Sequence, residues 1–264
     1  MSLVEFTKQK MSELGIDAKR SLGQNFLVSE HAITKICDEI VKNQWKQIIE
    51  VGPGLGSLTE ALIKIHRNIF LIELDRVFFK YWQDRGQTIV NADALDWDWQ
   101  IADPINTLFV SNLPYQISSR ILIDRCLDKT KLGKMILMFQ KEVAVKIRAK
   151  QTDPDYGMLS VMVQTFWKPK KLLELSTRDF YPAPKIASQV LVFESIPCTI
   201  DPEGFLTFLK LAFSHPRKMM ISNLTAGYPR LKALEAFGML GISENTRAAQ
   251  LTIAQFQELY QKLN

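Results

Sequence analysis

Short apolar runs alternate with helical patterns through the first half of the chain, and no other feature restricts its fold so strongly. Runs typical of buried strands occupy residues 47–51, 69–74, 88–90, 107–111 and 134–139. Segments with helical periodicity lie between or after them, at residues 58–65, 77–82, 117–127 and 142–148. Because strands joined through helices lie parallel, this alternation predicts an α/β fold whose parallel sheet carries helices on both faces.

The pattern changes near residue 196. Two more strands are predicted before that point, at residues 172–175 and 189–194, and no β-type run follows it. Residues 205–213, 218–224, 231–237 and 253–263 have helical patterns instead. We therefore predict an α/β domain over residues 1–195 and a small helical domain over residues 196–264.

A glycine-rich turn, EVGPGLG at residues 50–56, joins the first of these strands to its helix. Glycines at such a turn let the backbone approach a ligand at the carboxyl end of the sheet. The spacing is G-x-G-x-G, formed by Gly52, Gly54 and Gly56, and Ser57 stands where the dinucleotide fingerprint has its third glycine. The turn alone is weak evidence for a nucleotide-type ligand.

Carboxylates stand at the ends of the next two predicted strands. Glu73 ends the second strand, 73 − 52 = 21 residues after Gly52, and Asp93 follows the third. A carboxylate in the first position can accept hydrogen bonds from both ribose hydroxyls of NAD or S-adenosylmethionine, and one in the second can accept from an adenine amino group. Singly, either residue reads as a surface carboxylate. Three strand ends that line one crevice favour a nucleoside ligand.

The fourth strand ends in NLPY, residues 112–115, where Gly, Asp or Ser would serve a plain connector. Asn112 offers an uncharged amide acceptor. Pro114 fixes its own φ, so the carbonyl groups beside it can point into the crevice. Tyr115 offers a ring on which a planar base can stack. The group suits an exocyclic amine such as adenine N6, and the alternative is an ordinary Asx-Pro turn.

Composition limits the remaining classes. The longest apolar run has five residues (135–139), too short to cross a membrane. Three separated cysteines and three histidines that do not cluster with them predict neither a disulfide framework nor a metal site, and favour a cytoplasmic setting. Residues 129–185 carry 12 Lys and Arg against five Asp and Glu, within a chain of net charge +5. Charge alone fits a polyanionic partner and solvated helix faces equally.

The motifs together resemble those of the ribosomal RNA adenine N6,N6-dimethyltransferase family. The resemblance covers nearly the whole chain, and the matching stretches, in family order, are GQNFL (23–27), EVGPGLG (50–56), IELD (72–75), ADA (92–94), NLPY (112–115), YG and LSV (156–161) and FYPAPK (180–185). Leu113 and the run SLGQN at 21–25 favour the small-subunit branch over the erythromycin-resistance branch. The resemblance implies a Rossmann-like, S-adenosylmethionine-dependent methyltransferase sheet and a C-terminal helical domain that orients RNA.

By this resemblance, most of the site residues contact S-adenosylmethionine. The expected cofactor contacts are Asn25, Leu27, Gly52, Gly54, Gly56, Glu73, Asp93 and Asn112. Asn112 would also lie beside the target amine, and Tyr115 and Phe180 would sandwich the target adenine, so that these three form the catalytic group. No metal is implied.

The expected activity is dimethylation of adenine N6 in small-subunit ribosomal RNA, by a monomer that acts on ribosomal particles and also in ribosome assembly. A non-catalytic assembly factor and a large-subunit methylase of the erythromycin-resistance type remain alternatives, and an NAD-dependent oxidoreductase is disfavoured by the missing third glycine. The chain departs from the family pattern at Met158, at Gln116 and in PRKM at 216–219, where Pro216 is expected to begin a helix.

Overall fold

The computed structural model describes residues 2–16, 24–101 and 103–264 of the 264-residue chain. The chain forms two compact units: the first contains residues 1–122, 130–144 and 170–194, and the second contains residues 123–129, 145–169 and 195–264. The chain passes from the first unit to the second after residue 194, next to the predicted domain boundary. The second unit also takes in two earlier segments, which the helical patterns near the C-terminus do not indicate. The roles given to residues 1–195 and 196–264 stay predictions.

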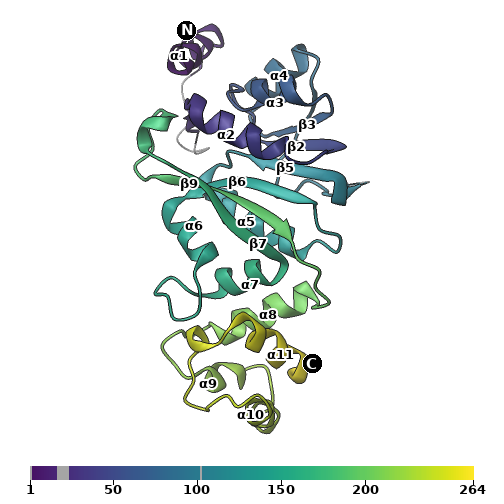
Figure 1. The fold of residues 1–264 in the computed structure, drawn as a ribbon, viewed down its shortest axis with the longest axis vertical. Coiled ribbons are helices and arrows are strands. Elements are labelled where there is room, and N and C mark those ends of the chain that lie inside the picture. The colour runs from purple at the N-terminus through teal and green to yellow at the C-terminus, as the bar shows by residue number, and fades with distance from the viewer. Residues whose placement is uncertain (1, 17–23, 102) are drawn as a thin grey trace. The chain divides into compact units, whose positions relative to one another are not determined.

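A seven-stranded sheet confirms the predicted α/β fold (Figure 1). The strand order is β4-β3-β2-β5-β6-β9-β7. The β2–β3, β2–β5, β3–β4 and β5–β6 pairs are parallel, and β9 is antiparallel to β6. The strands are β2 Gln47–Val51, β3 Ile69–Glu73, β4 Thr88–Asn91, β5 Thr107–Ser111, β6 Lys134–Gln140, β7 Trp167–Leu175 and β9 Ser188–Ser195.

Helices α3 Thr59–Ile65, α4 Arg76–Asp84 and α5 Tyr115–Leu127 connect parallel strands, as their periodicity predicts. Helix α2 Glu30–Ile40 precedes β2, and α6 Lys141–Arg148 follows β6. Ser29 caps α2 by accepting a hydrogen bond from the Ala32 N–H. Helix α1, Leu3–Glu13, lies before the first predicted element. A separate two-stranded antiparallel sheet pairs β1 Phe26–Leu27 with β8 Phe180–Tyr181, and the short helix η3 Thr177–Asp179 precedes β8.

One face of the sheet packs on α2 and α3 through a continuous apolar cluster. Ile33 and Ile36 of α2 and Leu62 of α3 belong to this cluster, together with residues of β2, β5, β6 and β9. The described part of the segment between β4 and β5 contains the short helix η2 Pro104–Asn106, and indole rings of this segment cover part of the other face. Trp97 stacks on Phe70, and the Trp99 ring centroid lies 5.1 Å from that of Phe109.

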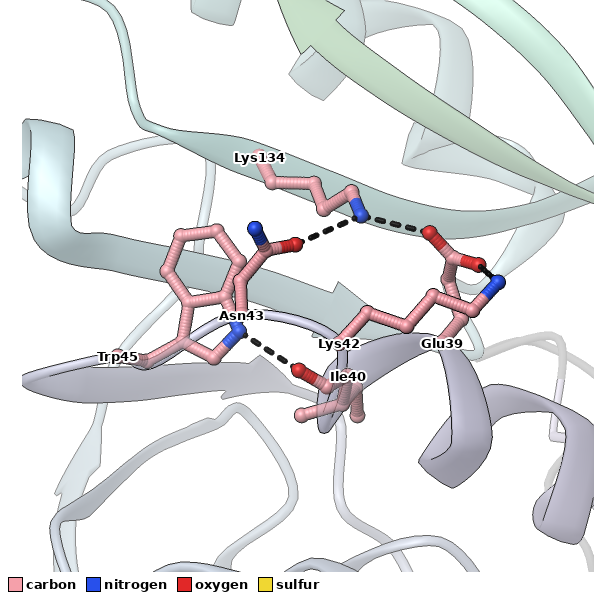
Figure 2. Close-up of polar contacts among 6 residues, drawn as sticks. All are labelled: Glu39, Ile40, Lys42, Asn43, Trp45 and Lys134. Carbon is pink, nitrogen blue, oxygen red and sulfur yellow. Dashed lines mark hydrogen bonds and ion pairs between the residues drawn. The ribbon is translucent and has the colours of Figure 1, made fainter.

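A buried ion pair fastens α2 to the first residue of β6 (Figure 2). The Lys134 ammonium lies 2.6 Å from Oε1 of Glu39, and the two side chains are only 7% and 12% exposed. Lys134 also donates to Oδ1 of Asn43 at 3.3 Å, and Glu39 pairs with Lys42 through its other oxygen. Lys134 belongs to the basic segment 129–185, so part of that segment's charge is neutralised inside the fold.

The second unit is helical over its C-terminal part, as predicted. It contains α7 Met158–Phe166, α8 Pro202–Ala212, α9 Met220–Leu224, α10 Arg230–Met239, the short helix η4 Ala248–Gln250 and α11 Ile253–Leu263. The Phe208 ring contacts those of Phe205 and Phe256 in its core. The expectation for Pro216 is wrong: this residue lies in a turn, and α9 begins at Met220. Among the described residues, no helix has both the length and the hydrophobicity needed to span a bilayer.

Candidate active site

The parallel register brings the carboxyl ends of β2, β3, β4 and β5 to one edge of the sheet. Val51 pairs with Ile72, and Glu73 pairs with Asn91. A cavity lies at this edge within the first unit. It is lined by nine of the ten residues singled out from the sequence: Asn25, Leu27, Gly52, Gly54, Gly56, Glu73, Asp93, Asn112 and Tyr115. Ligands of open α/β sheets bind at this edge, so the cavity is the candidate site.

Glu73 connects the glycine-rich turn to the second strand. Its Oε2 accepts a hydrogen bond from the Gly54 N–H at 3.2 Å, and its Oε1 accepts one from the Asp75 N–H at 2.8 Å. Burial raises the pKa of Glu73 to about 7, although these two N–H donors act in the opposite direction. The carboxylate is therefore fixed in direction and still has lone pairs for hydroxyl donors of a ligand.

The glycine-rich turn is held by an indole ring from α4. Trp82 Nε1 donates to the Gly54 carbonyl at 2.9 Å. Gly56 has φ +91°, and a Cβ atom at this position would lie 2.3 Å from the Trp82 ring. A side chain at residue 56 would both strain the backbone and displace the indole. The close approach of Trp82 explains why the third position of the turn is glycine.

Glu50 and Ser57 line the same cavity, and the sequence interpretation did not select either as a site residue. Glu50 is 2% exposed, and within the described residues its Oε2 has no hydrogen-bond partner. Burial raises its pKa to about 8, the neighbouring Thr59 hydroxyl acts to lower it, and the charge of Glu73 makes a smaller contribution that raises it. The Ser57 hydroxyl is likewise buried without a partner in the described part of the chain. The only feature of the sequence that could have indicated Glu50 and Ser57 as site residues is their position at the two ends of the glycine-rich turn.

Asp93 and its neighbour Asn91 close the third strand end. Asp93 lines the cavity, and its Oδ1 accepts a hydrogen bond from the Leu95 N–H at 2.9 Å. Asn91 Nδ2 donates to the Glu73 carbonyl at 2.8 Å, which ties the third strand end to the second. The second carboxylate oxygen of Asp93 can accept from an amino group in the cavity.

Residues 24–27 line the cavity as a strap that is hydrogen-bonded to residues at two strand ends. Gln24 Nε2 donates to Asp75 at 3.3 Å, and Asn112 Nδ2 donates to the Asn25 carbonyl at 3.0 Å. Phe26 packs edge-on against Phe78 of α4. These contacts bring Asn25 and Leu27 to the cavity from far away in the sequence. The preceding motif residues Ser21, Leu22 and Gly23 lie outside the described residues.

The NLPY segment keeps its polar groups at the cavity. Because Asn112 uses its Nδ2 as the donor to the strap, its Oδ1 provides the acceptor function at this strand end. The Pro114 carbonyl accepts from the Ile117 N–H at 3.1 Å in the first turn of α5, so one of its lone pairs is already occupied. Tyr115 is the first residue of α5, and its hydroxyl lies 2.7 Å from that of Ser188. Burial raises the pKa of Tyr115.

Phe180 is the one selected residue that does not line the cavity. Its side chain is 3% exposed and packs in the apolar cluster with Leu27 and Val190. It pairs with Leu27 across the small β1–β8 sheet, so it lies beside a cavity-lining residue. The proposed sandwich of the target base between Tyr115 and Phe180 stays a prediction. Among the described residues, no group of His, Cys, Asp and Glu has the arrangement of a metal site.

The sheet order and the cavity at its carboxyl edge define a Rossmann-like α/β fold. A dimethyladenosine transferase from Plasmodium falciparum has the same fold, with TM-score 0.77 and 21% identity over 89% of this chain and 95% of that one. The 23S rRNA methyltransferase ErmE gives TM-score 0.67 and 24% identity over 90% of this chain and 99% of that one.

The sequence identifies the family within this class. Residues 15–264 match the family described as "Ribosomal RNA adenine dimethylase", to which the chain therefore belongs. The Ribosomal RNA small subunit methyltransferase A of Bdellovibrio bacteriovorus is 43% identical over 263 residues, which cover 97% of this chain and 96% of that protein.

Proposed function

We propose that the protein transfers methyl groups from S-adenosylmethionine to N6 of adenines in small-subunit ribosomal RNA, twice for each target base. The hydrogen bond from Asn112 Nδ2 to the Asn25 carbonyl carries this proposal. It fixes an uncharged acceptor at a strand end, next to an aromatic ring and within a cavity suited to a nucleoside. Family membership supports the same activity.

The cofactor assignment follows from the donors and acceptors of the cavity. Glu73 would accept from the ribose hydroxyls and Asp93 from the adenine amino group, while Gly52, Gly54 and Gly56 allow the amino-acid end to lie against the backbone. Glu50 offers a buried carboxylate oxygen without a partner in the described part of the chain. An ammonium group of the ligand would satisfy that oxygen.

The chemistry requires positioning more than activation. The amine of adenine is a weak nucleophile because its lone pair is delocalised into the ring, whereas the cofactor supplies a methyl group on a sulfonium that needs no activation. Asn112 Oδ1 would accept a hydrogen bond from this amine and favour a tetrahedral nitrogen, and Tyr115 would hold the base plane. The site residues include no histidine, and the proposed mechanism needs none.

The small subunit is the preferred substrate because of the names and identities of the related proteins. The Bdellovibrio relative is named for the small subunit and is 43% identical, whereas ErmE, named for 23S rRNA, is 24% identical.

Exposed cations outside the cavity would supply phosphate contacts and make particle binding sensitive to salt. Those of residues 196–264 include Lys210, Arg217, Lys218, Arg230 and Lys232. The enzyme would act in the cytoplasm as a monomer, and an additional role in ribosome assembly is compatible with this activity.

The test is methylation of purified small subunits from cells that lack the protein. Mass spectrometry of the ribosomal RNA should detect dimethyladenosine only when both the protein and S-adenosylmethionine are added. Thermal unfolding should show stabilisation by S-adenosylmethionine and none by NAD, because ligand binding to the native state raises the melting temperature. Dimethylation confined to large subunits, or no methylation of either particle, would contradict the proposal.

A further inference from the structure

We propose that Ser188 is a positioning residue that holds the ring of Tyr115 in the plane on which the target adenine stacks. The inference rests on the proposed function, which assigns Tyr115 to the target base. The two hydroxyl oxygens lie 2.7 Å apart, although the residues are 73 positions apart in the chain. Ser188 is 0% exposed, so its hydroxyl faces the interior of the protein.

The burial of Ser188 argues for a specific role of its hydroxyl. Strand β9 is buried from Ser188 to Phe193, and the apolar residues Val190, Leu191 and Val192 follow in the same run. A hydroxyl at such a position is unfavourable unless it forms a hydrogen bond. The Tyr115 hydroxyl provides that bond.

The ring of Tyr115 needs an anchor at its far end. The residue begins α5, and the torsion that sets the plane of a tyrosine ring is broad. In the described part of the chain, the Tyr115 hydroxyl forms one hydrogen bond, to Ser188. A bond at the tip fixes the direction of the ring axis. Because a phenolic O–H prefers to lie in the plane of its ring, the bond also favours one orientation of that plane. The base plane would therefore be fixed before RNA arrives.

The Tyr115–Ser188 hydrogen bond, called the tether below, also joins two segments to which the family resemblance assigns the binding of the target base. They are NLPY (112–115) and the stretch that begins at Phe180. Ser188 begins β9, directly after the loop that follows Phe180 and Tyr181 of β8, and Tyr115 is the last residue of the NLPY segment. The loop is fixed beside Ser188, because the Lys141 N–H donates to the Ala187 carbonyl at 2.9 Å. The Tyr115–Ser188 hydrogen bond therefore holds the Tyr115 ring in a fixed position relative to β9.

Three variants separate positioning from stability: Ser188→Ala, Tyr115→Phe and the double variant. Tyr115→Phe leaves the buried Ser188 hydroxyl without its partner, and Ser188→Ala leaves the half-buried Tyr115 hydroxyl without its partner, so each should lower the melting temperature, Tyr115→Phe more. The double change removes both groups and should restore much of the loss. Methylation should behave differently, because the ring is untethered in all three. We expect kcat/KM for small subunits to fall roughly ten- to a hundredfold in each, mainly through kcat, the scale of a misplaced reactant.

Thr107→Val is the matched control. Its hydroxyl is equally buried and donates to the Asp103 carbonyl at 2.8 Å, but at the opposite end of β5 from Asn112. This variant should lose stability and keep its methylation rate. Binding of S-adenosylmethionine should stay unchanged in all four proteins, since no cofactor contact is removed.

The ring-flip rate of Tyr115, measured by NMR in the free protein, reports on the tether without RNA. It should rise in Ser188→Ala and stay unchanged in Thr107→Val. An unchanged rate in Ser188→Ala, or recovery of methylation together with stability in the double variant, would overturn the inference. Faster flipping in a protein that methylates no ribosomal particle would support the tether and count against the proposed function alone.

Discussion

Gly54 and Glu73 are joined across the candidate site: the N–H of the glycine donates to the carboxylate at 3.2 Å. The bond links the turn after β2 to the end of β3, so the two predicted cofactor contacts form one unit. Asp75 donates to the other oxygen of the same carboxylate. The carboxylate is thus oriented by two backbone donors before any ligand binds.

Replacement of Glu73 by Ala should weaken S-adenosylmethionine binding by roughly ten- to a hundredfold. The change removes the ribose acceptor and releases the Gly54 N–H, and hydrogen bonds to charged groups contribute about 1.5–3 kcal/mol each. Calorimetric titration measures the effect. Asp84→Asn on α4 is the control, because its side chain is 59% exposed and pairs with Lys80 on the surface. Equal affinity in Glu73→Ala and the control would remove Glu73 from the cofactor site.

Stability should depend on pH through two buried carboxyl groups. Burial raises the pKa of Glu50 to about 8 and that of Glu73 to about 7, against about 4.3 in the unfolded chain. A raised folded-state pKa means that the native state binds the proton more tightly. The stabilisation is complete below about pH 4 and is lost as the pH rises through 7 and 8.

The measurement is the free energy of unfolding of the ligand-free protein between pH 5 and pH 9. It should fall with increasing pH from these two groups, and Glu50→Gln should make the dependence shallower. Glu258→Gln, at an exposed position of α11, should leave it unchanged. A profile of the Glu50→Gln variant that is parallel to that of the native protein would show that Glu50 titrates normally.

Elements with clear periodicity were predictable from the sequence, and short or non-periodic ones were not. The parallel strands alternate with amphipathic helices, so their type and order follow from local pattern. Strands β1 and β8 have two residues each and exist because Phe26 and Leu27 pair with Tyr181 and Phe180. No window of sequence contains that pairing.

The residues of the candidate site can likewise be divided into those that the sequence could predict and those that it could not. Residues at strand ends could be selected because parallel strands bring their carboxyl ends together, and Gly52, Glu73, Asp93 and Asn112 do line one cavity. Glu50 lies inside a strand, where its side-chain direction depends on the pleat and on burial. The depth of Phe180 is also a tertiary property: its ring packs in the core cluster beside Leu27.

Alanine at Gly56 should destabilise the protein more than alanine at a glycine with free space around it. The added Cβ would lie 2.3 Å from the Trp82 ring, and φ is +91°. Gly15→Ala is the control, because Gly15 has φ +61° and nothing within 4 Å of an added Cβ. The control should lose about 1–2 kcal/mol from backbone strain alone. Equal losses by denaturant unfolding would show that the indole moves freely.

Asn112→Ala should lower the methylation rate by about a hundredfold or more, the scale of losing one positioned polar group in a transition state. The variant also loses the bond to the Asn25 carbonyl, so cofactor affinity should fall more modestly. Asn112→Asp keeps an acceptor and loses the donor to the strap. Rates at saturating cofactor separate the two effects, and a native rate in Asn112→Ala would show that the acceptor is misassigned.

The ion pair between Lys134 and Glu39 should matter for stability and not for the site. Lys134 begins β6, at the opposite end of the strand from the edge that carries the cavity. Burial acts to raise the pKa of Glu39, but hydrogen bonds from Lys134 and Lys42 outweigh it and hold the pKa below its usual value. The contribution of Glu39 to stability is therefore present above its unfolded pKa and is lost as the pH falls through the folded pKa.

Lys134→Ala should destabilise the protein by about 3–5 kcal/mol, because it leaves the largely buried Glu39 carboxylate without its buried cation. The remaining bond to Lys42 places the expected loss at the lower end of that range. Replacing both partners, as Lys134→Met with Glu39→Leu, should recover most of the loss, since apolar side chains of similar volume fill the same space without desolvating charge. Urea unfolding measures both effects, and calorimetry should give the same S-adenosylmethionine affinity for all three proteins. If the double variant were less stable than Lys134→Ala, the pair would be a net source of stability, and α2 would depend on charge more than on its apolar face.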